Sequence, residues 1–144
     1  NEKSCFKRRP SLGITFSDPD IATIGKRYKE IVDEGIDFVT GFVSFEGQGR
    51  SIVKLKEKGM LKIFADKKTG EILGSELFAP DGEHLAHLIA WGIALKLTVS
   101  EMLKMPFYHP VIEEGLRTAL RDARLQIDNQ SNLELFRCSD TPIR

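Results

Sequence analysis

One histidine has neighbours that could support proton-transfer chemistry. His109 is followed directly by Pro110, and Glu113 and Glu114 come next. Because proline biases the preceding residue toward extended backbone, His109 should lie just before a helix, with Pro110 near the helix's first turn. The bend would let Glu114 reach back and accept a hydrogen bond from one imidazole nitrogen. A carboxylate placed there fixes the tautomer and leaves the other nitrogen as an acid or base near neutral pH.

The same spacing has a plainer interpretation. His109 could bond to the backbone, while Glu113 and Glu114 only complement the positive end of the helix dipole. X-Pro bonds are also where cis peptides occur, and a cis His109–Pro110 bond would turn the imidazole away from the helix axis. Spacing alone leaves the catalytic and the structural interpretations open.

Other chemical signatures are weak in this sequence. It contains neither a GxGxxG fingerprint nor a phosphate-binding P-loop. The glycine-rich segment 46–51 falls between predicted strands, which favours a β-turn over a phosphate cradle. His84 and His87 are three residues apart on a predicted helix, but no third ligand lies near them in sequence. We therefore expect no metal site.

Composition indicates one ordinary globular domain. The 144 residues carry 21 basic and 21 acidic side chains, a balance that gives no support to nucleic-acid binding. The apolar run 88–95 is too short to cross a bilayer, and we find no signal-peptide pattern at the start, so we expect a cytoplasmic protein. Cys5 and Cys138 are expected to be free thiols, with a redox pair joining the termini as the alternative.

Hydrophobic periodicity predicts an α+β fold, in which helices pack on one face of an antiparallel sheet. The composition predicts a linker at residues 1–10, the folded domain at 11–127 and a flexible tail at 128–144. Thr98 and Glu101 form a capping-box pattern at one helix start. The predicted elements are a strand at 11–17, a turn at 18–25, a helix at 26–35, strands at 37–45, 50–57, 59–66 and 71–79 with hairpin turns at 57–59 and 66–70, a helix at 82–97, and a last helix from about 111 to 127.

Three segments occur in an order typical of one protein family. Residues 10–25 contain a strand, a phenylalanine and an Asp-Pro pair, and residues 59–80 form a predicted hairpin with Lys62 and Gly74. Residues 107–116 place a glutamate five positions after the histidine of a His-Pro pair. From about residue 10 to 125 the chain resembles the C-terminal dimerisation domain of the FAD-dependent pyridine nucleotide-disulfide oxidoreductases, with the dihydrolipoamide dehydrogenases as the nearest branch.

The resemblance implies a place in a longer enzyme. Domains preceding this one would bind FAD and NAD(P), and this chain alone would bind no cofactor and be inactive. It would form a homodimer and contact the flavin and nicotinamide domains of its parent chain. His109 and Glu114 would act as an acid/base pair in the partner subunit's active site. The backbone of His109 and Pro110 would lie near the partner's flavin.

Two alternatives remain at this stage. A soluble pyridine nucleotide transhydrogenase-type relative would keep the His-Glu pair but lack redox cysteines. A free-standing interaction module on the same fold would have no catalysis. Phe107, Tyr108 and the segment 82–87 depart from the usual family pattern, so the sequence leaves the substrate open.

Overall fold

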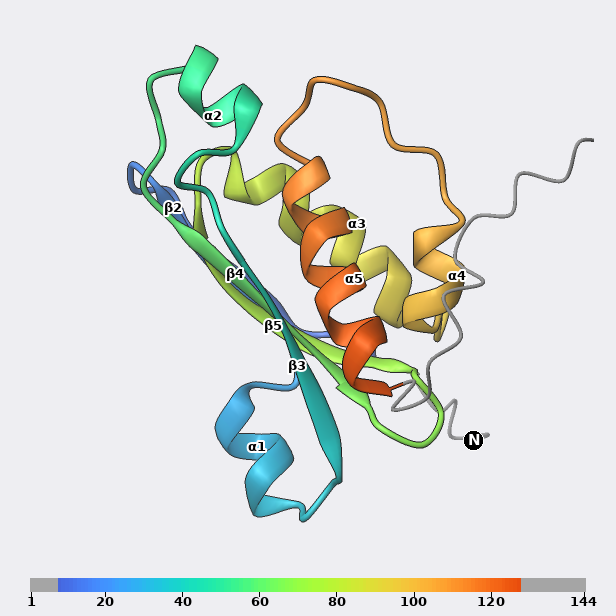
Figure 1. The fold of residues 1–144 in the computed structure, drawn as a ribbon. Helices are drawn as coiled ribbons and strands as arrows, with labels where there is room; N and C mark the ends of the chain where they lie inside the picture. Colours follow the sequence, from blue (N-terminus) through green and yellow to red (C-terminus); the bar gives the residue numbers. More distant parts are fainter. Residues whose placement is uncertain (1–7, 128–144) are drawn as a thin grey trace, which may run out of the picture.

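A five-stranded antiparallel sheet forms the centre of the molecule (Figure 1). The computed structural model describes residues 8–127. The strand order is β1-β2-β5-β4-β3, so β1 and β3 are the two edges. The strands are β1 Leu12–Thr15, β2 Asp20–Gly25, β3 Phe38–Ser44, β4 Met60–Asp66 and β5 Ile72–Ala79.

Most of the helical structure covers one face of this sheet, which confirms the predicted α+β class (Figure 1). The helices are α1 Tyr28–Asp33, α2 Gly49–Val53, α3 Gly82–Ala94, α4 Val99–Leu103 and α5 Glu114–Ile127. The short α1 differs, because it covers part of the opposite face. There the rings of Tyr28, Phe38 and Phe64 contact one another with centroids 5.6 to 5.9 Å apart.

The main core lies between the sheet and the helices α3 and α5. Alternate strand residues such as Ile24, Leu61 and Ile63 are fully buried there, as period-two strands require. One face of α5 and of the turn before it packs into this core, except at the end of the helix, where Ile127 is only partly buried. Its buried members are Ile112, Leu116, Ala119, Leu120 and Ala123.

Helix α5 crosses the edge strand β3 unusually closely. A Cβ added at Gly41 would lie 2.1 Å from the Ala119 carbonyl oxygen, so only glycine fits there. The Phe42 amide donates to Asp122 Oδ2 at 2.9 Å, and Gln126 Nε2 donates to the Thr40 carbonyl oxygen at 2.7 Å. These two side chains therefore form hydrogen bonds with backbone groups of β3 at the outer edge of the sheet, where no neighbouring strand of the described residues pairs with them.

The turn predicted at 18–25 is wrong for most of its length. Residues 20–25 form β2, an interior strand that pairs with both β1 and β5. Only the stretch around Pro19 turns the chain. Ala22 and Ile24 alternate into the core, so tertiary pairing stabilised a strand where the Asp-Pro signal had suggested a longer turn.

The strand predicted at 50–57 is also wrong. The segment forms α2 instead, and its β-branched residues Ile52 and Val53 are exposed. A strand there would need a free sheet edge, but Asp122 and Gln126 already bond to the nearby edge at β3. The predicted hairpin at 57–59 is consequently only a connection from α2 to β4, whereas the hairpin at 66–70 between β4 and β5 is confirmed.

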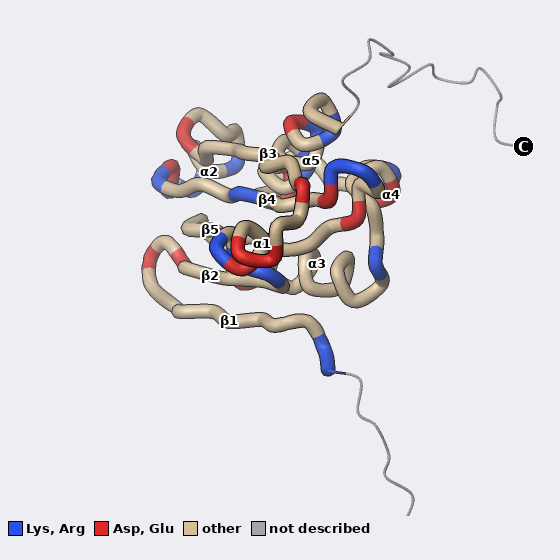
Figure 2. Tube along the Cα trace, turned by 90° about the horizontal axis from the view of Figure 1, so that it is seen from below, with Lys and Arg blue, Asp and Glu red and all other residues tan. Residues whose placement is uncertain are grey.

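The remaining expectations have mixed outcomes. The last helix begins at Glu114 rather than near Val111, because residues 112–115 form a turn closed by Gly115 N and the Ile112 carbonyl oxygen at 2.9 Å. Basic and acidic residues are interspersed over the described chain (Figure 2). No helix among residues 8–127 is long and apolar enough to cross a membrane. Cys5, Cys138, the tail 128–144 and most of the linker 1–10 lie outside the described residues.

Candidate acid/base site

The loop from α4 to α5 carries His109 on an exposed turn. Phe107 packs against the core, and the Arg117 guanidinium lies over its ring, 5.9 Å from the centroid. Two residues later the His109 side chain is 81% exposed. The His109–Pro110 peptide bond is cis. A partly buried aromatic anchor thus holds a loop whose next residues point to solvent.

His109 and Glu114 form the side-chain contact that was one of the two arrangements allowed by their spacing. Nδ1 of His109 lies 3.0 Å from Oε1 and 2.9 Å from Oε2 of Glu114. An ionised carboxylate can only accept, so Nδ1 carries the proton of this bond and the tautomer is fixed. Nε2 has no hydrogen-bond partner within residues 8–127 and faces outward with the exposed ring.

Glu114 is held by more than the histidine. It is the first residue of α5, its side chain is 27% exposed, and Oε2 also accepts from the Val111 amide at 3.3 Å. The hydrogen bond from His109 lowers the pKa of Glu114, and the bond from the Val111 amide acts in the same direction. The carboxylate therefore stays ionised beside the imidazole, where it can stabilise a positive charge.

Sequence reasoning missed the residues that support this turn from the other side. Gln48 is the N-cap of α2: its Oε1 accepts from the Ser51 amide at 2.7 Å, while its Nε2 donates to the Val111 carbonyl oxygen at 2.9 Å. The buried ring of Phe45 lies against Gly115, where an added Cβ would be 2.6 Å from a ring carbon. Gln48 and Val111 are 63 positions apart in the sequence, so no local pattern signalled their contact.

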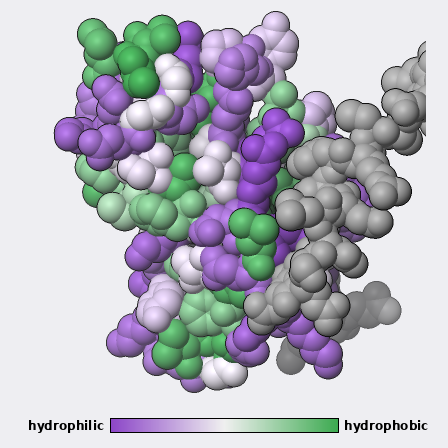
Figure 3. All heavy atoms as spheres, viewed as in Figure 1, coloured by the Kyte–Doolittle hydropathy of each residue, from purple (hydrophilic) through white to green (hydrophobic). Residues whose placement is uncertain are grey.

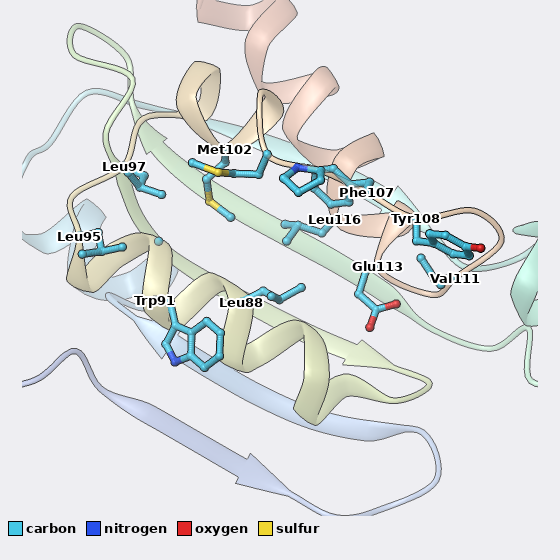
Figure 4. A pocket seen from close by; sticks show the side chains of 13 residues that line it. Leu88, Trp91, Leu95, Leu97, Met102, Phe107, Tyr108, Val111, Glu113 and Leu116 are labelled. Carbon is cyan, nitrogen blue, oxygen red and sulfur yellow. The ribbon is translucent and has the colours of Figure 1, made fainter.

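An apolar pocket of about 460 Å³ lies beside the turn (Figure 4). It is open between α3, α4 and the loop that leads to His109, and Tyr108, Val111 and Glu113 line the end nearest the histidine. Large hydrophobic side chains around it are unusually exposed, with Trp91 at 63% and Leu95 at 71%. Contiguous exposed hydrophobic surface of this kind marks an interaction site.

The other candidates from the sequence do not assemble into sites. His87 Nδ1 lies 2.7 Å from the Glu83 carbonyl oxygen within α3, and His84 Nε2 lies 3.6 Å from Glu83 Oε1. Within the described part of the chain, no group of three histidine, cysteine, aspartate or glutamate residues could hold a metal ion. The glycine-rich segment 46–51 forms the entry to α2.

A second group of carboxylates surrounds the start of α3. A hydrogen bond between Asp20 and Glu83 raises the pKa of Glu83, and burial acts in the same direction. Asp81, the N-cap of this helix, forms an ion pair with Lys54. Here a neighbouring carboxyl group raises the pKa of Glu83, and a lysine pairs with a third carboxylate at the helix start.

Comparison with known proteins gives one consistent answer. The chain is 31% identical over 111 residues to a dihydrolipoyl dehydrogenase of Rhizobium etli, covering 77% of this chain and 23% of that protein. It is 27% identical over 117 residues to dihydrolipoyl dehydrogenase 3 of Haloarcula marismortui, covering 81% of this chain and 24% of that protein. It thus spans about a quarter of the length of these curated relatives.

Solved structures agree in fold. The HOCl-induced flavoprotein disulfide reductase RclA from Escherichia coli, as its Cu(II) complex, matches with a TM-score of 0.75 at 22% identity, covering 79% of this chain and 26% of that one. LpdA from Mycobacterium tuberculosis matches with a TM-score of 0.74 at 24% identity, covering 82% and 26%. Residues 12–120 match the family described as pyridine nucleotide-disulphide oxidoreductase, dimerisation domain. The chain belongs to this family.

Proposed function

We propose that this chain is the dimerisation domain of a flavin-dependent pyridine nucleotide-disulfide oxidoreductase of the dihydrolipoamide dehydrogenase type. In the assembled homodimer, His109 and Glu114 act as an acid/base pair in the active site of the partner subunit. The observation that carries this proposal is the geometry of the pair. Nδ1 of His109 is bonded to Glu114 at 2.9 Å, and the rest of the ring is exposed.

The chemistry follows from the free nitrogen. When a redox-active disulfide of the parent enzyme oxidises a substrate dithiol, a substrate thiol must lose its proton so that its sulfur can attack, as a thiolate, one sulfur of that disulfide and displace the other. Nε2 of His109 takes this proton, and the ionised Glu114 stabilises the imidazolium that results. In the reverse direction the imidazolium returns the proton to a departing thiolate. Glu114 orients the ring throughout, because its bond at Nδ1 keeps Nε2 available.

The cofactors are bound mainly by other parts of the parent protein. This chain carries no glycine-rich dinucleotide fingerprint, so FAD and NAD(P) are held by flavin and nicotinamide domains, and the isolated 144-residue chain is inactive. The exposed turn at His109 and Pro110 leaves room for a second protomer's flavin to approach its backbone. The flavin, when bound, would supply the two-electron chemistry.

The direct test is His109→Gln in the full-length protein. Turnover with a disulfide substrate is expected to fall by about two to four orders of magnitude, because the proton acceptor is lost. The flavin absorption spectrum should be unchanged. His84→Gln, on α3 and also exposed, is the matched control and should retain normal turnover. Wild-type rates in His109→Gln would end the catalytic assignment.

The homodimer contact is proposed at the exposed apolar surface around the pocket. The exposure of Trp91 and Leu95 on the outer side of α3 suits a two-fold interface, in which the same patch meets its copy. Tyr108 extends this surface toward the His109 turn, which would carry the histidine into the partner.

Sedimentation of the full-length protein tests the interface. Trp91→Glu should shift the dimer toward monomer, because a charge would be buried without a partner. Val53→Glu is the control, since Val53 is an equally exposed hydrophobic residue on α2, away from the pocket. Dissociation by Val53→Glu but not by Trp91→Glu would place the interface elsewhere.

A further inference from the structure

The support of the His109 turn from α2 suggests a role for Gln48, a residue with no chemistry of its own. The peptide units on both sides of Val111 are fixed. Its amide donates to Glu114 Oε2 at 3.3 Å, and its carbonyl oxygen accepts from Gln48 Nε2 at 2.9 Å. The hydrogen bonds therefore form a continuous chain from the Ser51 amide through Gln48, Val111 and Glu114 to the His109 imidazole.

Each partner in this chain has a fixed donor or acceptor character. The Ser51 amide can only donate and the Val111 carbonyl can only accept, so the orientation of the Gln48 amide is determined by its neighbours. The accepted and donated hydrogen bonds of the single Gln48 amide polarise each other, and the backbone of Val111 connects them mechanically to the bond at Glu114. Losing the bond at Val111 would free the loop on the side opposite Glu114.

Helix α2 has little hydrophobic anchorage to replace this bond. Its residues Ile52 and Val53, and Leu55 just beyond it, are exposed, and Figure 3 shows hydrophobic atoms at the surface over this helix. Within the described residues, the side chains at its two ends contact more distant parts of the fold through polar groups: Gln48 bonds to Val111, and Lys54 pairs with Asp81. Gln48 is therefore a principal link between α2 and the histidine turn.

We propose that Gln48 is a positioning residue for His109, acting through the backbone of Val111. The proposal rests on the acid/base role proposed above. It assigns to the loop between β3 and α2 a part in setting where Nε2 of His109 points. A shift of about 1 Å in a reacting group can cost as much as a hundredfold in rate, so a bond two residues from the histidine is well placed to matter.

The test uses two substitutions in the full-length protein. Gln48→Glu keeps an acceptor for the Ser51 amide but sets a carboxylate against the Val111 carbonyl oxygen. Gln48→Met has a similar volume and removes both bonds. Both variants should lower kcat for the disulfide substrate by about tenfold, with KM for the nicotinamide changed less than about twofold. Equal losses in the two variants are expected because both break the bond to Val111.

Gln126→Met is the matched control. Gln126 also donates to a backbone carbonyl, that of Thr40 at 2.7 Å, but far along α5 from His109. It should lower the melting temperature about as much as Gln48→Met and leave kcat unchanged. A lower kcat in Gln48→Met with a normal kcat in Gln48→Glu would mean that Gln48 acts only as a helix cap and would contradict the proposal. A normal kcat in both variants would also contradict it.

A second measurement separates this proposal from the acid/base role. The ring-nitrogen shifts of His109 in ¹⁵N-histidine-labelled protein, assigned by their loss in His109→Gln, should move in both Gln48 variants and stay in place in Gln126→Met. If His109→Gln turned over normally, the acid/base role would fail, while these shifts would still decide whether Gln48 positions the ring. Unmoved shifts would refute positioning even if the acid/base role held.

Discussion

The starts of α5 and α3 place the same residue type in opposite electrostatic settings. In α5, Glu114 lies beside His109, and the hydrogen bond between them lowers the pKa of the glutamate. In α3, Glu83 lies beside Asp20, and the hydrogen bond between the two carboxyl groups raises the pKa of Glu83. Both glutamates occupy the first turn of their helix.

The difference indicates that the adjacent side chain affects the pKa of the glutamate more than the helix dipole does. A helix dipole favours an ionised carboxylate at either start by about 0.3–1 kcal/mol. One pKa unit corresponds to about 1.4 kcal/mol, so a single close carboxyl group can reverse that preference. At α5 the lowered pKa keeps the glutamate ionised beside a histidine, where it can stabilise a cation, whereas at α3 the raised pKa makes ionisation of the glutamate less favourable.

The largest effect that should separate the two helix starts is on turnover. Glu114→Gln should slow the full-length enzyme by about tenfold to a hundredfold, because the imidazolium loses its counter-charge but keeps an acceptor at Nδ1. Glu83→Gln should leave turnover within about twofold. Steady-state kinetics measures both. A loss in Glu114→Gln larger than in His109→Gln would reverse the roles assigned to the pair.

The start of α4 tests whether a helix cap with no proposed catalytic role affects the stability of the fold but not turnover. Thr98 caps α4: its hydroxyl accepts from the Glu101 amide at 3.2 Å, and its own amide donates to the Glu101 side chain at 2.8 Å. Thr98→Ala should lower the free energy of unfolding by about 1 kcal/mol, measured by urea denaturation, with normal kcat. Thr98→Ser should retain most of the stability, and equal losses in both would argue against the cap.

The smallest effect, and the sharpest contrast, is in the pH dependence of stability. The lowered pKa of Glu114 contributes stability that is present above its ordinary value of 4.5 and is lost as the pH falls through the folded value. The raised pKa of Glu83 contributes stability that is present below 4.5 and is lost as the pH rises through the folded value.

Denaturation between about pH 3 and 7 compares each variant with the wild type. Relative to Glu114→Gln, the wild type should gain stability as the pH rises. Relative to Glu83→Gln, it should lose stability over the same range. Parallel curves for the two variants would mean that the two glutamates do not differ in the way their neighbours require.

The sequence by itself determined the features that depend on nearby residues. The apolar stripes of α3 and α5, the hairpin at 66–70 and the capping box of Thr98 and Glu101 all arise within a few positions of one another. The bend at Pro110 and a separation of five residues also made the contact between His109 and Glu114 possible, but they left a bond from His109 to the backbone as the alternative, and the structure shows the contact with Glu114. The catalytic role of the pair remains a prediction.

Tertiary structure decided the features that depend on distant partners. Residues 20–25 became a strand because β1 and β5 lie on either side of them, and 49–53 became a helix while α5 side chains bonded to the edge at β3. Gln48 meets Val111 across 63 positions. Backbone and amide groups must find hydrogen-bond partners wherever the fold provides them, and local periodicity carries no information about partners so far away.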